Sequence, residues 1–101
     1  MYGYTMRVAQ DIGTYRAMHQ AVVDLMGDNR DGLILHVAAP SANGFEVTEV
    51  WHSKDLLDAF NRDILPAAIQ RAGVTMDPAD VQVTEFDPVV VITPGAYSSD
   101  T

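Results

Sequence analysis

The chain has 101 residues, of which 14 are acidic and 6 basic, so its formal net charge is −8. This length suits one domain with a modest core, and a negative surface without a basic patch argues against a nucleic-acid partner. The sequence has no cysteine, which excludes disulfides and thiolate chemistry, and no apolar run suited to a membrane span or a signal peptide, so we expect a cytoplasmic protein.

The first elements of the chain are a strand and an amphipathic helix. Residues 4–9 favour a strand, and Asp11 is a good N-cap for a helix that begins at residue 12. Turn-forming residues at 27–32 end this helix. Its apolar stripe recurs at the helical period and contains Tyr15, Met18, His19, Val22 and Leu25 or Met26.

A β-hairpin is expected next. Residues 33–39 and 45–52 are strand-like runs, and Asn43-Gly44 between them favours a tight turn. The second run carries apolar side chains on both faces, which is typical of a sheet that is covered on both sides. These side chains are Phe45, Val47 and Trp51 on one face and Val50 on the other.

The second half of the chain predicts a helix and a last strand. Ser53 is an N-cap, and Pro66 predicts a kink or a new helix start before the chain stops at Gly73. Residues 81–92 predict a strand, with a possible division at Asp87-Pro88. Residues 94–101 are expected to form a flexible tail. The stripe of this helix contains Leu56, Leu57, Phe60, Ile64 and Ala68.

The order strand, helix, strand, strand, helix, strand predicts one α+β domain over residues 1–93 with the ferredoxin-like βαββαβ arrangement. In that arrangement two helices cover one face of a four-stranded antiparallel sheet. The strands carry apolar residues on both faces, so the helix-free face needs a cover as well. We therefore expect a homodimer in which a second copy covers this face.

Three stretches resemble a known family: the strand "GLILHVA", the strand "EVTEVWHS" and the helix that carries Phe60 and "ILPAAI". They look like the antibiotic biosynthesis monooxygenase superfamily of dimeric α+β barrels, and most closely its small, mostly uncharacterised bacterial members. The resemblance implies the dimeric barrel fold. Members of this superfamily include cofactor-free oxygenases of quinol or anthrone-type rings, haem-degrading enzymes and proteins with no known activity, so the resemblance leaves these three possibilities open. Haem-degrading members carry a histidine on the second helix where this chain has Phe60 or Asn61, so the resemblance favours haem binding less than the other functions, and we expect no cofactor.

His36 and Glu49 form the candidate catalytic pair. If Asn43-Gly44 is the turn, His36 lies opposite Trp51 and diagonal to Glu49 on the same face of the sheet. A register shifted by two residues places His36 opposite Glu49 and keeps the shared face. A carboxylate beside an imidazole can hold its tautomer and make it a general base for a hydroxyaromatic substrate that reacts with dioxygen. The alternative is that His36 is a strand residue with no catalytic role.

Four other side chains are candidate substrate contacts: Trp51, Tyr15, His19 and Phe60. Each has a structural alternative, since Trp51 can fill the corner between strand and helix, and Tyr15 and His19 can be edge residues with buried rings. No metal site is expected, because the three histidines have no close spacing and no Ca²⁺-loop pattern occurs.

Two main functions remain open at this point. One is a cofactor-independent monooxygenase, with a ring-closing or isomerising enzyme as a variant that uses the same pocket. The other is a non-catalytic binding or regulatory dimer that holds a small apolar or aromatic molecule.

Overall fold

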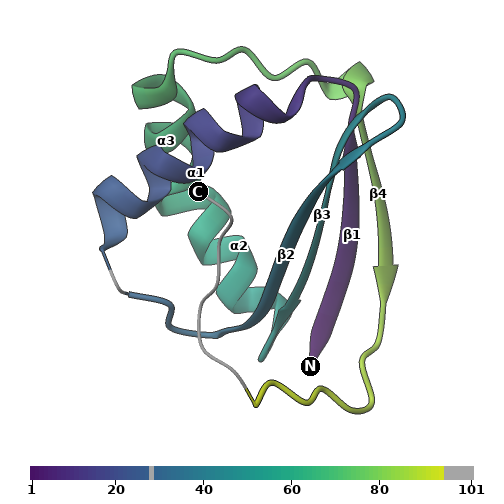
Figure 1. The fold of residues 1–101 in the computed structure, drawn as a ribbon. Helices are drawn as coiled ribbons and strands as arrows, with labels where there is room; N and C mark the ends of the chain where they lie inside the picture. The colour runs from purple at the N-terminus through teal and green to yellow at the C-terminus, as the bar shows by residue number, and fades with distance from the viewer. Residues whose placement is uncertain (28, 95–101) are drawn as a thin grey trace.

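The structure is a computed structural model and describes residues 1–27 and 29–94. Its four strands form one antiparallel sheet in the order β2-β3-β1-β4, and the helices cover one face of it (Figure 1). The predicted ferredoxin-like fold is therefore confirmed. Its elements are β1 (Tyr2–Val8), α1 (Ile12–Met26), β2 (Leu33–Ser41), β3 (Gly44–Trp51), α2 (Lys54–Asp63), α3 (Leu65–Ala72), the short 3-10 turn η1 (Pro78–Asp80) and β4 (Val81–Phe86).

The helices begin and end where the capping residues predict. Asp11 accepts a hydrogen bond from the backbone N–H of Thr14 at 3.1 Å, and the Ser53 side chain accepts one from Leu56 at 3.3 Å. The second predicted helix is interrupted before Pro66, and α3 starts there with the proline in its first turn. Gly73 ends α3 in the left-handed conformation, with a φ of 68°.

Two residues of the predicted stripes lie outside the core. Leu25 and Leu56 are exposed, whereas their neighbours Met26 and Leu57 are turned further inward. A spacing pattern alone does not decide which of two adjacent apolar residues faces the core, because helices curve and their ends fray.

The hairpin turn is one residue earlier than the sequence predicts. Ser41 pairs with Gly44, so Ala42 and Asn43 occupy the turn, and His36 lies opposite Glu49 rather than opposite Trp51. Gly44 is required at this point because a Cβ there would overlap the carbonyl oxygen of Val8. The two-residue shift in register leaves the side chains from Leu35 to Ser41 on their predicted faces, whereas an irregularity between Leu33 and Leu35 places Leu33 opposite Trp51.

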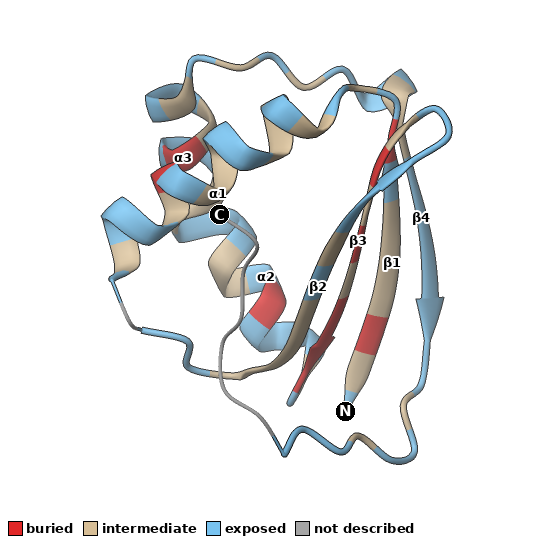
Figure 2. Ribbon diagram, in the orientation of Figure 1, coloured by how far each residue is buried: buried red, intermediate tan, exposed pale blue. Residues whose placement is uncertain are grey.

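The core lies between the sheet and the helices. Val8, Phe45 and Val47 are buried at its centre, and Tyr15 of α1 packs against them. Buried residues concentrate along β3, whereas β4 is exposed along most of its length (Figure 2). The covered centre of the sheet is therefore the place where a polar side chain would be shielded from water.

The helix-free face is apolar at one end only. Val50 is buried there beside Leu35, and the ring of Phe86 covers Gly3. Farther along, Val37 is 50% exposed, and the same cross-strand row carries a hydrogen-bonded pair of threonines, Thr5 and Thr48. The expectation that both faces are apolar throughout is thus correct for the Val50 end and wrong for the rest of this face.

The predicted last strand ends early. β4 stops at Phe86, and the four apolar residues 89–92 after Pro88 are not part of the sheet. Of these four, Val89 is 88% exposed, Val90 73% and Ile92 80%. The predicted tail at 94–101 lies outside the described residues, apart from Pro94. Within the described part of the chain, no helix is long and apolar enough to cross a membrane.

Candidate functional site

One row of side chains crosses the helix-facing side of the sheet and forms the candidate site. The register places His36 of β2 opposite Glu49 of β3, Glu49 opposite Tyr4 of β1, and Tyr4 opposite Glu85 of β4. Glu49 lies at the covered centre of this row and is 7% exposed. Antiparallel pairing on one face brings these groups within hydrogen-bonding reach although they are far apart in the sequence.

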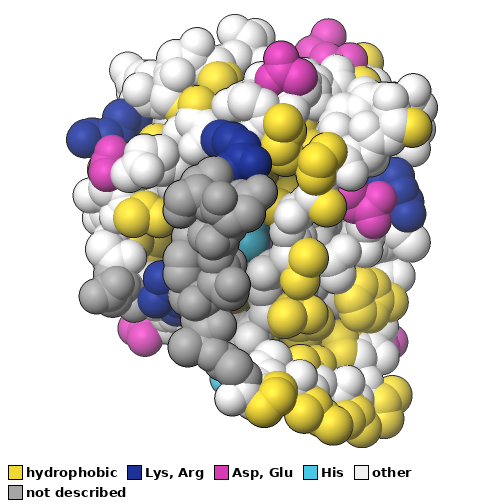
Figure 3. All heavy atoms as spheres, in the orientation of Figure 1, with side chains coloured by type: hydrophobic (Ala, Val, Ile, Leu, Met, Phe, Trp, Pro, Cys, Tyr) yellow, Lys and Arg dark blue, Asp and Glu magenta, His cyan; other side chains and the backbone are white. Residues whose placement is uncertain are grey.

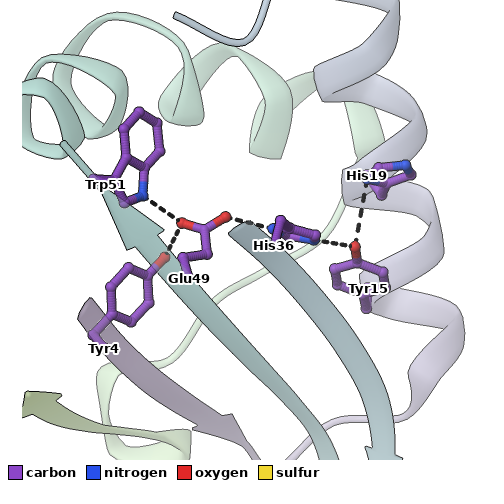
Figure 4. Close-up of polar contacts among 6 residues, drawn as sticks. All are labelled: Tyr4, Tyr15, His19, His36, Glu49 and Trp51. Carbon is purple, nitrogen blue, oxygen red and sulfur yellow. Dashed lines mark hydrogen bonds and ion pairs between the residues drawn. The ribbon is translucent and has the colours of Figure 1, made fainter. Parts of the chain in front are cut away.

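Glu49 accepts three hydrogen bonds from neighbouring side chains (Figure 4). The Tyr4 hydroxyl lies 2.5 Å from Oε1 and the Trp51 indole nitrogen 3.0 Å from the same oxygen. The Nδ1 of His36 lies 2.5 Å from Oε2. Burial raises the pKa of Glu49, but the hydrogen bonds from His36, Tyr4 and Trp51 outweigh it, and the net pKa is below its ordinary value. The side chain is therefore held as a carboxylate.

Tyr4 is a member of this network that the sequence did not reveal. Burial raises the pKa of its hydroxyl, and the negative charge of Glu49 raises it further, so Tyr4 stays protonated and acts as a donor. The only sequence signal for this contact is the strand register that pairs positions 4 and 49, and that register becomes known only with the fold.

The other ring nitrogen of His36 contacts α1. The Tyr15 hydroxyl lies 2.6 Å from Nε2 of His36 and 3.4 Å from Nδ1 of His19. The rings of Tyr15 and His36 are stacked with their centroids 6.0 Å apart. Burial, together with His36 and Arg30, lowers the pKa of His19, which favours its neutral form. Helix α1 thus brings two predicted contact residues to the predicted base.

These contacts determine which nitrogen of a neutral His36 ring carries the proton. A carboxylate can only accept, so Nδ1 of His36 must carry a proton, and Nε2 of the neutral ring is then an acceptor. Tyr15 donates its hydroxyl proton to that nitrogen. On taking a proton from a bound molecule, Tyr15 can pass its own hydroxyl proton to Nε2 of His36, and Glu49 can stabilise the imidazolium that results.

The predicted contact residues fall into two groups. Tyr15 and His19 lie beside His36, whereas Phe60 lies against Trp51, with ring centroids 5.8 Å apart. Trp51 and Phe60 line a hollow of about 230 Å³. His36 is not among the residues that line it, and Trp51 joins the two groups because its indole N–H donates to Glu49. The other lining residues are Met26, Asn29, Asp31, Leu56, Ala59, Asp63 and Ile64.

A larger hollow, of about 370 Å³, lies at the opposite end of the sheet beside the hairpin turn. It is formed around Asp11, Pro40 and Gly44 and includes none of the predicted site residues. Volume alone therefore does not locate the candidate chemistry, which lies in the hydrogen-bonded row.

Residues 1–27 and 29–94 hold no group of three or more His, Asp or Glu side chains placed to bind a metal ion. Phe60, near the position of the haem-ligating histidine in the resembled family, packs against Trp51 instead.

Comparisons with known proteins connect this fold to a class. No family model and no curated protein sequence matches the chain. Among solved structures, a candidate antibiotic biosynthesis monooxygenase from Caulobacter crescentus is 22% identical, with a TM-score of 0.62 over 88% of this chain and 90% of that one. Another from Deinococcus radiodurans is 16% identical, with a TM-score of 0.55 over 95% of this chain and 100% of that one. A dimeric ferredoxin-like protein of unknown function from Jannaschia is 15% identical, with a TM-score of 0.58 over 86% of this chain and 98% of that one.

The chain therefore shares the ferredoxin-like fold of these solved structures, two of which are described as candidate antibiotic biosynthesis monooxygenases, and the resemblance seen in the sequence is confirmed at the level of the fold. The fold alone does not define an activity, which must be argued from the site.

Proposed function

We propose that the protein is a cofactor-independent monooxygenase that acts on flat, electron-rich aromatic molecules of the quinol, anthrone or polyketide type. The observation that carries this proposal is the chain of contacts from Glu49 through His36 to Tyr15. In this chain of contacts a buried carboxylate orients the imidazole that we propose as the base. The descriptions of the Caulobacter and Deinococcus neighbours support the same class.

The reaction needs only a proton acceptor from the protein. An anthrone-type CH₂ group loses a proton to the Tyr15–His36 relay and becomes an electron-rich carbanion. This carbanion gives electrons to dioxygen and forms a carbon–oxygen bond, and the resulting peroxide loses water to leave a carbonyl group. In total, CH₂ and O₂ give C=O and H₂O, so the substrate supplies all four electrons. The apolar rings of Trp51 and Phe60 are the walls for its flat skeleton.

We also propose a homodimer, through the helix-free face of the sheet around Val37. The half-exposed Val37 on this face and the dimeric Jannaschia neighbour support it. A mass of about twice 11.0 kDa by light scattering is expected at micromolar concentration.

Oxygen uptake with anthrone and hydroxynaphthalene compounds tests the catalytic proposal. Uptake is expected with the wild-type chain, and His36→Ala and Tyr15→Phe should each lower kcat by at least about 100-fold, in line with the usual contribution of a general base. His52→Ala is the matched control, because His52 is exposed and has no place in the network. Unchanged turnover in His36→Ala would remove the proposed base.

A second candidate is a non-catalytic dimer that binds a small aromatic molecule. The observation in its favour is that both ring nitrogens of His36 are engaged within the chain, as in a structural hydrogen-bond network. This candidate predicts a thermal shift with aromatic ligands, no oxygen uptake, and a larger loss of affinity in Trp51→Ala than in His36→Ala.

A further inference from the structure

The Tyr15 hydroxyl lies between two imidazole rings rather than beside one. It is 2.6 Å from Nε2 of His36 and 3.4 Å from Nδ1 of His19. The ring planes of Tyr15 and His19 are inclined by only 20°, and those of His19 and His36 by 24°, with ring centroids 5.7 and 6.0 Å apart. Three side chains from helix α1 and strand β2 therefore form one stacked group around a single hydroxyl.

The carboxylate of Glu49 determines the direction of each hydrogen bond in this group. Glu49 can only accept, so the neutral His36 ring donates from Nδ1 and accepts at Nε2 from Tyr15. A hydroxyl has one proton, and Tyr15 donates it in that bond. The contact between Tyr15 and His19 is therefore a hydrogen bond only when Nδ1 of His19 carries a proton and donates it to the Tyr15 oxygen.

His19 is in a suitable state for this role. Burial lowers its pKa, and the nearby His36 on β2 and Arg30 after α1 lower it further, so the ring is neutral at neutral pH. A neutral imidazole has one N–H group, which it can place on Nδ1. His19 thus donates a hydrogen bond without adding a positive charge beside His36.

A donor to the Tyr15 oxygen lowers the energy of the most costly state of the relay. An ordinary tyrosine hydroxyl has a pKa of about 10 and an ordinary imidazolium one of about 6.5, so proton transfer from tyrosine to histidine is uphill. A hydrogen bond to an ionised oxygen is shorter and about twice as strong as one between neutral groups. The 3.4 Å contact should therefore shorten as negative charge develops on Tyr15, as catalytic hydrogen bonds often do when a substrate binds.

A molecule from solvent can reach this group. The His36 side chain is 27% exposed, and Tyr15 and His19 are half-buried. In Figure 3, histidine surface (cyan) is visible near the middle of the view, where Figure 1 places β2 beside the helices. The relay is therefore not sealed inside the protein.

We infer that His19 is a second histidine of the proton relay, which donates from Nδ1 to the Tyr15 oxygen and stabilises the phenolate while Tyr15 passes its proton to His36. In this step the O–H bond of Tyr15 breaks and an N–H bond forms at Nε2 of His36. Tyr15 then regains a proton from the substrate, and no electron is exchanged with the protein. His19 acts through Tyr15 and is a positioning residue. Its role in turnover rests on the proposed function, whereas the hydrogen bond does not.

The tautomer of His19 tests the hydrogen bond without a substrate. Long-range ¹H–¹⁵N correlation spectra of the wild-type chain should show the proton of the neutral His19 ring on Nδ1. Tyr15→Phe should shift the Nδ1 resonance, because this nitrogen loses its acceptor, and the exposed His52 is the reference within the same spectrum. A wild-type proton on Nε2 of His19 would overturn the inference.

Two substitutions at residue 19 test the role in turnover. His19→Leu removes the donor, and kcat for anthrone should fall by about 10- to 100-fold, the usual worth of a hydrogen bond to a charged group. His19→Asn places an amide N–H near the position of Nδ1 and should restore part of this loss. Gln20→Leu is the matched control, because Gln20 is exposed on the same helix and bonds to Asp24 instead. Circular dichroism checks that all variants keep their fold.

The outcomes separate this inference from the catalytic proposal. Oxygen uptake at the wild-type rate in His19→Leu would overturn the inference and leave the proposal standing. Equal losses in His19→Leu and His19→Asn would show that the ring matters only for packing, and would overturn it as well. No uptake by the wild-type chain would overturn the catalytic proposal, and the tautomer of His19 would still decide whether the hydrogen bond exists.

Discussion

Nδ1 of His36 on β2 lies 2.5 Å from Oε2 of Glu49, its partner on the neighbouring strand β3. The carboxylate is buried, and its other oxygen accepts from Tyr4 and Trp51, so four strand positions share one hydrogen-bond network. Such a network is stable only while every buried member keeps its partner. Its dependence on Glu49 can be measured without knowing a substrate.

Replacement of Glu49 by alanine should be strongly destabilising. The change leaves the buried indole N–H of Trp51 and the hydroxyl of Tyr4 without their acceptor, and we expect a loss of about 3 kcal/mol in the free energy of unfolding. Urea denaturation followed by tryptophan fluorescence measures it. Glu46→Ala on the same strand is the control, because its ion pair with Arg7 is exposed and should contribute less than about 1 kcal/mol. Equal losses in the two variants would show that the Glu49 network adds no stability.

The same carboxylate should make the protein sensitive to acid. The pKa of Glu49 in the folded chain lies below its ordinary value of 4.5, so the folded state binds fewer protons than the unfolded state near that pH. The stability that Glu49 contributes is therefore complete above pH 4.5 and is lost as the pH falls through the folded pKa. Urea midpoints measured between about pH 3 and 6 should fall steeply at the acidic end. Glu49→Gln should flatten this part of the profile, and an unchanged profile would contradict the assignment.

The direction of the proton relay predicts the tautomer of His36. In the neutral form of the His36 imidazole, Nδ1 should carry the proton because Glu49 can only accept it. Long-range ¹H–¹⁵N correlation spectra distinguish the two tautomers. Tyr15→Phe should leave the Nδ1–H tautomer in place, whereas Glu49→Ala should convert it to a mixture. A wild-type spectrum with the proton on Nε2 would reverse the proposed relay.

Local chemistry in the sequence predicted much of the fold but only part of the site. Helix starts are marked by Asp11, Ser53 and Pro66 through interactions within a few residues. Such local signals can be recognised from the sequence alone. The shared face of His36 and Glu49 was also predictable, since a two-residue shift in register does not change faces. Tyr4 was not, because its bond to Glu49 joins positions 45 residues apart and depends on the whole sheet order.

The two largest errors in the sequence predictions have a shared physical origin. The Asn43-Gly44 dipeptide favours a turn by itself, but the close approach of the Val8 backbone assigns Gly44 to the start of β3 instead. Residues 89–92 have the composition of a strand, but a strand forms only where an edge is available to pair with. In the first case a distant part of the chain decides between local alternatives, and in the second the segment has no partner strand among the described residues.

The position of Gly44 gives a last prediction. A methyl group at residue 44 would overlap the Val8 carbonyl oxygen and approach the backbone of Gln10, so β1 and the hairpin would have to separate. We expect Gly44→Ala to lower the free energy of unfolding by at least about 3 kcal/mol, as severe overpacking does. Gly73→Ala separates this steric effect from conformational strain, because residue 73 has a positive φ but no atom near its Cβ position, and it should lose only about 1–2 kcal/mol. Similar losses at the two glycines would mean that β1 and the hairpin are free to move apart, and the register that aligns Tyr4 with Glu49 would then have to be held by the side chains of the network alone.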